Sequence, residues 1–244
     1  MRNNTKKVKS ISDLLRFLKK DCSNYKGQIW YRGQSVASWK LLPSFARKKK
    51  SNSEFTSISR FKQNASLLIN HPPLNYFDWL FQMQHYGVPT RLLDWTESAL
   101  TALYFAVEDV KYLRKDGAIW MLLPTELNKN ANIYSDEHFY LPSFDDDILK
   151  SHDPETFYRD KTTKLYPLAA IATRNNARMQ AQLGVFTISH RDTTAIEDIG
   201  DKSHIWKYVI PNKNKKTIKL ELAMLGFTKF QLFPELTSIG ELLK

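Results

Sequence analysis

The chain has 244 residues and a mass of 28.5 kDa, which suits one ordinary domain with a sizeable hydrophobic core. Its 42% hydrophobic and 25% charged residues exclude a disordered, collagen-like or coiled-coil protein. The net charge is +11, residues 1–50 hold fourteen Lys and Arg against two Asp, and a second basic run lies at 207–219. Concentrated positive charge attracts polyanions, so we expect a nucleic-acid partner, with an ordinary solvated surface as the alternative.

The first predicted element is a basic amphipathic helix over residues 9–20, with Ser10 or Ser12 as its N-cap. Its apolar face repeats at helical spacing and consists of Ile11, Leu14, Leu15 and Leu18. Residues 28–33 form a short aromatic run that ends in glycine, which predicts a strand. Residues 54–70 predict a weaker helix.

An aromatic helix follows over residues 76–86, capped by Asn75 and closed by Gly87. His85 falls in its last turn, where the helix dipole favours a protonated imidazole. Thr96 is expected to cap the next helix, because apolar residues recur after it at helical spacing.

Residues 118–123 form a continuous apolar run that is typical of a buried strand. The later predicted elements are strands over 184–190 and 205–210 and helices over 216–225 and 234–243. Strands and helices mix without strict alternation, so we predict one α+β domain over 1–244, with mixed or antiparallel sheets and flanking helices. Its parts are a basic helical segment (1–27), a core (28–125 and 166–240) and an acidic insertion (126–165) with little regular structure.

Several common sites are excluded by the residues present. Neither G-x-G-x-x-G nor G-x-x-x-x-G-K-[ST] occurs, which removes the two commonest phosphate loops. Cys22 is the single cysteine and the histidines lack metal-ligand spacing, so we expect neither a disulfide nor a metal. No apolar run approaches the ~18 residues that span a bilayer, and the N-terminus lacks a signal-peptide core. We therefore expect a cytoplasmic protein without a membrane partner.

The densest group of chemically active side chains lies in residues 84–96. It contains the His85 imidazole, the Arg91 guanidinium, the Asp94 carboxylate and the Thr96 hydroxyl. A turn that leads into a helix N-terminus would also offer free backbone N–H groups to an anion. The structural alternative is a buried ion pair between Arg91 and Asp94 that braces the turn.

Several segments match a known pattern in order: WYRGQS (30–35), LPS (42–44), QHYGVPTRLLDWTESALTALYFAV (84–107), RMQAQLGVF (178–186), and Gly226 followed by LFPEL (232–236). Together they resemble the FRG domain. The resemblance covers roughly residues 28–240, and the aromatic-Arg-Gly signature of the family is here Tyr31, Arg32 and Gly33. It implies a protein of bacteria or their phages that is often encoded near defence genes.

A looser similarity links the chain to ADP-ribosyltransferases of the arginine–serine–glutamate type. It rests on the order of Arg32, Thr96 or Ser98, an A-x-x-F helix at 102–105, a strand at 117–123, and Gln180 or Gln182 before a further strand. The similarity implies an ADP-ribosyltransferase-like fold with NAD as substrate. The implied NAD-binding residues are Tyr31, Arg32, Gly33, Gln34, Arg91 and Thr96. The implied substrate-binding residues are Arg178, Gln180 and Gln182, and the implied catalytic residues are Arg32, His85, Asp94 and Gln182.

The chain departs from these transferases where it carries Gln182 in place of the catalytic glutamate. Glutamine can donate and accept hydrogen bonds but cannot take a proton, so Asp94, Glu97 or His85 would have to supply the base. We expect a mono-ADP-ribosyltransferase, acting as a toxin or defence effector on an intracellular acceptor such as RNA or DNA, with an antitoxin or regulatory protein as partner. The alternatives are a non-catalytic nucleotide- or nucleic-acid-binding module of a defence or toxin–antitoxin system, and a hydrolase built on His85 and Asp94.

Overall fold

The computed structural model describes residues 6–47, 53–69, 72–134, 139–174, 176–191 and 194–243, with backbone alone at 241 and 242. Residues 1–5 and 48–50, which belong to the basic stretch 1–50, lie outside these residues.

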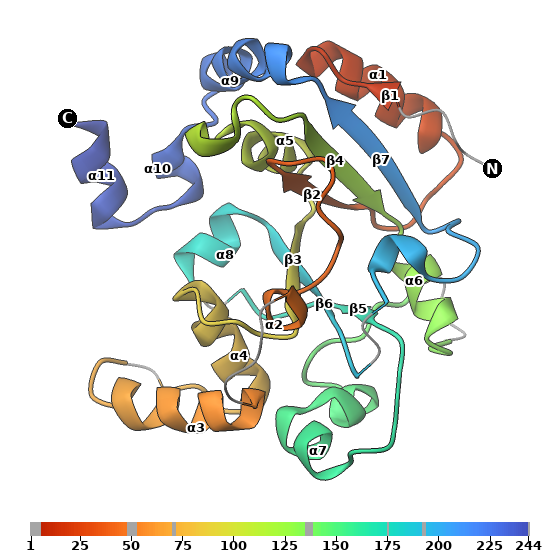
Figure 1. Cartoon of the computed structure of the whole chain (residues 1–244), viewed down its shortest axis with the longest axis vertical. Coiled ribbons are helices and arrows are strands. Elements are labelled where there is room, and N and C mark those ends of the chain that lie inside the picture. Colours follow the sequence, from red (N-terminus) through yellow and green to blue (C-terminus); the bar gives the residue numbers. More distant parts are fainter. Residues whose placement is uncertain are drawn as a thin grey trace.

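A seven-stranded sheet runs through the molecule in the order β1-β7-β4-β2-β3-β6-β5 (Figure 1). The strands are β1 (Lys6–Lys7), β2 (Trp30–Gln34), β3 (Leu92–Thr96), β4 (Gly117–Leu122), β5 (Leu168–Ala170), β6 (Gly184–Ile188) and β7 (Ile205–Ile210). Neighbouring strands are antiparallel except β1 and β7, which are parallel. The prediction of a single α+β domain with a mixed sheet is therefore confirmed.

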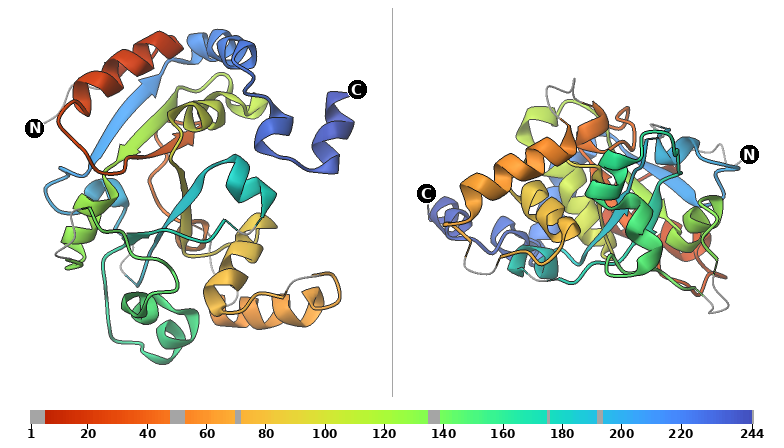
Figure 2. Two further views of the ribbon diagram at one scale, coloured as in Figure 1. Left: turned by 180° about the vertical axis from the view of Figure 1, so that it is seen from behind. Right: turned by 90° about the horizontal axis from the view of Figure 1, so that it is seen from below.

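Helices lie beside the sheet at both ends of the molecule (Figure 2). In the described part of the chain they are α1 (Ile11–Asp21), α2 (Ser44–Arg47), α3 (Glu54–Ala65), α4 (Tyr76–His85), α5 (Ala99–Val107), α6 (Pro124–Asn130), α7 (Pro154–Arg159), α8 (Ala177–Ala181), α9 (Lys215–Met224), α10 (Lys229–Leu232) and α11 (Leu236–Leu242). Ser10 and Asn75 cap α1 and α4 as predicted, each accepting a bond from the backbone N–H three residues on. Gly87 follows α4 with φ of 75°, a conformation that glycine adopts without strain.

The sheet divides into two halves at the junction of β2 and β3. Among the described residues, Tyr31↔Thr96 is the one register pair between these strands. Beyond it β2 stays paired with β4 as far as Gln34↔Ala118, whereas β3 stays paired with β6 as far as Leu92↔Ile188. The first half (β1, β7, β4, β2) and the second half (β3, β6, β5) therefore diverge from a single point.

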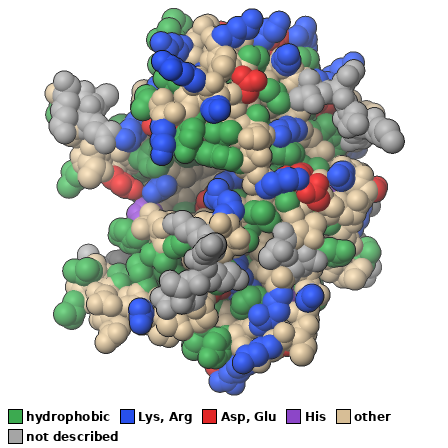
Figure 3. Space-filling model, in the orientation of Figure 1, with side chains coloured by type: hydrophobic (Ala, Val, Ile, Leu, Met, Phe, Trp, Pro, Cys, Tyr) green, Lys and Arg blue, Asp and Glu red, His purple; other side chains and the backbone are tan. Residues whose placement is uncertain are grey.

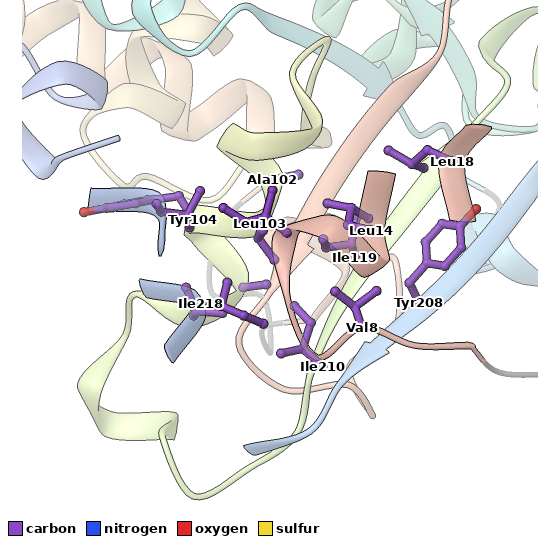
Figure 4. Close-up of a cluster of buried hydrophobic side chains, with 14 of the residues drawn as sticks. Val8, Leu14, Leu18, Ala102, Leu103, Tyr104, Ile119, Tyr208, Ile210 and Ile218 are labelled. Carbon is purple, nitrogen blue, oxygen red and sulfur yellow. The ribbon is translucent and has the colours of Figure 1, made fainter. Parts of the chain in front are cut away.

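Each half carries its own layer of helices. One face of β4 and β7 packs against α1, α5 and α9, and Figure 4 shows this first cluster, which includes Leu14, Leu103 and Ile119. In the second half, β6 packs against α3 and α4 in a second cluster that includes Phe81 and Phe186, with ring centroids 4.8 Å apart. The helical layers of the two halves therefore belong to two separate buried clusters.

A third cluster joins the two halves on their other faces. It contains Trp30 and Trp120 from the first half and Trp95 from the second. The indole N–H of Trp120 donates to Gln34 Oε1 (2.8 Å), and that of Trp95 donates to Thr187 Oγ1 (3.1 Å). Buried indoles need such acceptors, so these bonds fix the rings at the base of the junction.

Two expectations about the elements were wrong. Thr96 does not cap α5: it ends strand β3, and Ser98 is the N-cap, its hydroxyl accepting from the Thr101 N–H. The insertion over 126–165 has more regular structure than expected, with most of α6, a 3₁₀ helix (Asp147–His152) and α7. Phe144 belongs to the second buried cluster, so apolar side chains anchor this acidic segment.

No helix in the described part of the chain is long and apolar enough to cross a membrane. No group of three or more His, Cys, Asp or Glu side chains in that part could hold a metal ion.

Candidate functional site

A cleft of about 440 Å³ opens where the two sheet halves diverge. Tyr31 and Phe105, which pack on the first cluster, form one wall, and Phe81 and Phe186 of the second cluster form the other. The predicted site residues that line it are Tyr31, Arg32, Gly33, Gln34, His85, Asp94, Thr96, Arg178 and Gln182. Four separate stretches of sequence therefore meet in one cavity of a size that suits a small ligand.

Arg32 on β2 reaches across the divergence to β3. Its Nη1 donates to the backbone oxygen of Asp94 (2.5 Å) and lies 3.9 Å from the Asp94 carboxylate oxygen Oδ2. The Arg32 side chain is 18% exposed, and its Nε is buried without a hydrogen-bond partner among the described residues. An unpaired buried donor is costly, so its presence at this position needs an explanation.

Burial lowers the pKa of the Arg32 guanidinium, and the Asp94 carboxylate opposes that effect. The positive charge of Arg47, which also lines the cleft, lowers the pKa further. Arginine nevertheless stays protonated at neutral pH. Arg32, Arg47 and Arg178 outnumber the carboxylate of Asp94 in the described lining, so the cleft favours an anion.

Gln84, which sequence analysis gave no role, orients Asp94. Its amide nitrogen donates to Asp94 Oδ2 (2.9 Å), and its amide oxygen accepts from the Thr90 hydroxyl (2.5 Å). The Thr90 bond sets which end of the amide faces Asp94. Gln84 precedes His85 on α4, so one helix end carries two polar cleft residues.

His85 lies in the last turn of α4, as predicted, but its charge state differs from the expectation. Burial lowers the pKa of His85, the Arg178 guanidinium lowers it further, and Glu235 raises it in part. The prediction of a favoured imidazolium was wrong, since burial and Arg178 outweigh the helix dipole. Nε2 of His85 lies 3.8 Å from Glu235 Oε1.

Thr96 and Gln182 are joined by a hydrogen bond in the lining of the cleft. The Thr96 hydroxyl donates to the Gln182 backbone oxygen (2.6 Å) and accepts from the Ser98 N–H (3.0 Å). The Gln182 side-chain amide donates to the Leu232 backbone oxygen (2.9 Å). Gln182 thus links the end of α8 to α10, and the next residue, Leu183, has φ of 48°, a strained value for a branched side chain.

Arg178 and Phe233 form a second contact between α8 and the C-terminal segment. The guanidinium carbon of Arg178 lies 4.7 Å from the Phe233 ring centroid. Phe233 also packs edge-on against Phe105 of the cleft wall, with centroids 5.9 Å apart. Stacking on an aromatic ring restricts the guanidinium while leaving its N–H groups available.

Two predicted site residues lie outside the cleft. Arg91 is 2% exposed, its Nε pairs with Glu54 Oε2 (2.6 Å), and its other nitrogens donate to the backbone oxygens of Ser189 and His152. Arg91 therefore braces the scaffold, and its burial outside the cleft keeps it from a phosphate bound there. The predicted alternative, an ion pair with Asp94, had the right role but the wrong partner.

Gln180 is exposed on α8 and is absent from the described cleft lining. The expected anion site at the helix start after Thr96 is also absent there, because none of residues 97–101 is among the described lining residues. The N–H groups of Ser98 and Thr101 are satisfied by the Thr96 and Ser98 hydroxyls.

One family model matches part of this chain. Residues 27–115 match the FRG domain. The match ends before α8 and β6, so it includes Arg32, His85, Asp94 and Thr96 but neither Arg178 nor Gln182. No curated protein and no solved structure matches the chain.

The sequence Tyr31-Arg32-Gly33 has a structural reason in this molecule. Arg32 lines the cleft, while Gly33 lies against helix α5. A Cβ atom on Gly33 would lie 1.9 Å from the Ala102 backbone oxygen. The glycine therefore permits the close contact of β2 with α5 that presents Arg32.

Proposed function

We propose that the cleft binds NAD and that the protein transfers ADP-ribose from NAD to an intracellular acceptor, RNA or DNA. One observation carries this proposal: Arg32, Thr96 and Gln182, separated along the chain, line one cleft. They follow the order in which arginine–serine–glutamate transferases use their motif residues. The resemblance to the FRG domain supports a role as a toxin or defence effector, controlled by an antitoxin or regulatory protein.

The described residues fit a dinucleotide diphosphate. Arg32 has an unpaired Nε and offers its guanidinium to the pyrophosphate, and Arg47 and Arg178 add positive charge. The aromatic side chains Tyr31, Trp39 and Phe105 provide surfaces on which a planar base or nicotinamide ring can stack. When bound, NAD supplies a glycosidic bond whose cleavage develops positive charge on the ribose, while the protein's residues position both partners.

Arg32→Lys should weaken NAD binding by roughly 10–100-fold, the scale of a lost charge-assisted hydrogen bond. A lysine ammonium cannot reproduce the planar fork of a guanidinium. Calorimetric titration with NAD and with ADP-ribose measures the effect. Arg60→Lys, the same change at an exposed position on α3, is the matched control. Equal affinities of the two variants, with NAD bound by both, would argue against a phosphate clamp at Arg32.

The nucleic-acid acceptor is proposed from charge on the opposite side of the first cluster. Helices α1 and α9 lie together, joined by the Ile11 N–H that donates to Glu221 Oε2 (2.9 Å). Figure 3 shows Lys and Arg side chains gathered along the upper edge of the molecule over these helices. We call this region the basic surface. Its exposed lysines, which lie in or next to α1 and α9, are Lys7, Lys9, Lys19, Lys20, Lys213, Lys216 and Lys219.

Replacing Lys213 and Lys216 by glutamine should lower the slope of log affinity against log salt by roughly 1.5–2. Each lysine that neutralises a phosphate releases a counterion on binding, so its loss removes part of the salt dependence. Fluorescence anisotropy of a labelled RNA across a salt series measures the slope. The control is the double variant Lys161→Gln and Lys164→Gln, which removes the same charge from exposed positions after α7. Equal slopes for both double variants would place the nucleic-acid surface elsewhere.

A non-catalytic binding module is the second candidate, and one observation favours it. The Gln182 amide already donates to Leu232, and glutamine cannot act as the base that these transferases use at this position. Incubation with labelled NAD separates the two functions. Binding of NAD with no release of nicotinamide would support the module.

A further inference from the structure

A transfer reaction in this cleft needs a group that accepts the acceptor's proton. Gln182 cannot do so. Asp94 is the one carboxylate in the described lining, and its Oδ2 accepts a hydrogen bond from Gln84 while facing the Arg32 guanidinium. Both partners hold the Asp94 carboxylate in place, with Gln84 Nε2 at 2.9 Å and Arg32 Nη1 at 3.9 Å from Oδ2.

A second carboxylate approaches the cleft from the C-terminal segment. Glu235 precedes α11, and its Oε1 is buried without a hydrogen-bond partner among the described residues. That oxygen lies 3.8 Å from His85 Nε2. The segment before Glu235 is fixed to the cleft by the bond from Gln182 to Leu232 and by the packing of Phe233 on Arg178. The position of Glu235 next to His85 is therefore set by the cleft residues themselves.

Two charged groups act on His85, namely Arg178 from α8 and Glu235 from the segment between α10 and α11. The ring of Tyr86 packs edge-on against His85, with centroids 4.7 Å apart. Burial and Arg178 lower the pKa of His85, so the imidazole is neutral at pH 7 and has a lone pair to offer. An imidazolium formed there would be stabilised by Glu235 and by the C-terminal end of α4.

We infer that His85 is the proton acceptor of the reaction and that Glu235 is its positioning residue. In the tautomer that carries its proton on Nε2, the nitrogen 3.8 Å from Glu235 Oε1, His85 keeps a lone pair on Nδ1. As the acceptor's oxygen or nitrogen bonds to ribose C1′, the bond from C1′ to the nicotinamide nitrogen breaks and its electron pair leaves with nicotinamide. The acceptor's proton passes to Nδ1. This inference rests on the proposed transferase function.

Glu235→Gln tests the pair, because it keeps the shape of the side chain and removes its charge. Transfer of label from NAD to RNA should fall by about 10–100-fold, within the range of assisted proton transfer. NAD affinity should stay within a factor of about 2, since the phosphates are held by Arg32. Glu235→Asp should recover part of the rate. Glu155→Gln on α7, at a side chain that is 38% exposed and outside the described cleft lining, is the control that should leave transfer unchanged.

Titration of the His85 ring by NMR gives a readout that does not depend on turnover. Glu235→Gln should lower the His85 pKa, because the carboxylate raises it in the intact protein. His85→Gln should remove most of the transfer, and adding Glu235→Gln to it should cost little more, because the two groups act as a unit.

The outcomes separate this inference from the proposed function. Normal transfer by Glu235→Gln, or an unchanged His85 pKa, would overturn the pair while leaving the transferase standing. If the unmodified protein binds NAD but never releases nicotinamide, the transferase function fails and the proton-acceptor role of His85 fails with it.

Discussion

Arg91→Met should lower the free energy of unfolding by about 3–5 kcal/mol, the cost of leaving one partner of a buried ion pair alone. Both side chains are almost inaccessible, at 2% for Arg91 and 1% for Glu54. Glu54 also accepts the Arg91 backbone N–H (2.8 Å), so its carboxylate cannot turn to solvent without breaking a second bond. Burial and the charge of Arg91 lower the pKa values of His152 and His190 to about 3 and about 4, so these neighbours are neutral at pH 7.

Urea denaturation of Arg91→Met against Arg159→Met measures this cost. Arg159 pairs with Glu155 on the surface of α7, and such exposed pairs contribute about 0.3–0.5 kcal/mol. Adding Glu54→Gln to Arg91→Met should recover part of the loss, because it removes the uncompensated charge. If both single variants unfold at the same urea concentration as the unmodified protein, the Arg91–Glu54 pair does not stabilise the fold. The prediction that Arg91 binds a ligand would then stand again.

Gly33→Ala should destabilise the protein by roughly 3 kcal/mol or more, the upper range for forcing extra atoms into a packed interior. The added Cβ would lie 1.9 Å from the Ala102 backbone oxygen and 2.8 Å from the Ala106 nitrogen. These atoms belong to the backbone of α5, so no side chain can rotate away. The helix would have to shift off β2, which would disturb the first cluster and the position of Arg32.

Gly184→Ala is the matched control for Gly33→Ala. Gly184 also lies in a strand and lines the cleft, but a Cβ there would meet Met179 O at 3.5 Å, an ordinary contact. Thermal unfolding should therefore shift strongly for Gly33→Ala and slightly for Gly184→Ala. Similar shifts for both variants would mean that β2 and α5 can separate without cost.

The elements with strong local signals were predictable from the sequence. Asn75 and Gly87 bracket α4, and the unbroken apolar run of β4 left little room for another assignment. Strand β3 was not predicted, because its polar residues Asp94 and Thr96 were interpreted as site residues in a turn. The apolar residues around them nevertheless fit a buried strand. Pairing with β6 on one side decides the conformation there, and a local pattern does not show it.

The cleft was predictable in its main residues but not in their contacts. Arg32, Thr96 and Gln182 came from a family resemblance, and the fold brings them together. Arg91 was misassigned because a buried arginine and a ligand-binding arginine look alike in sequence, and its partner Glu54 lies in another helix. Glu235 had no local signal at all, since only tertiary packing places it beside His85.

The single pair Tyr31↔Thr96 between the sheet halves has a mechanical consequence. On either side of that pair the ladder is interrupted, so the cleft walls belong to two leaves that share few main-chain bonds with each other. Arg32 bridges them through Asp94 O where a further strand pair would otherwise lie. A ligand bound between the two sheet halves would contact both of them, adding non-covalent interactions that the backbone does not supply. Its binding energy would then appear as tighter cooperativity between two units that could otherwise unfold more independently.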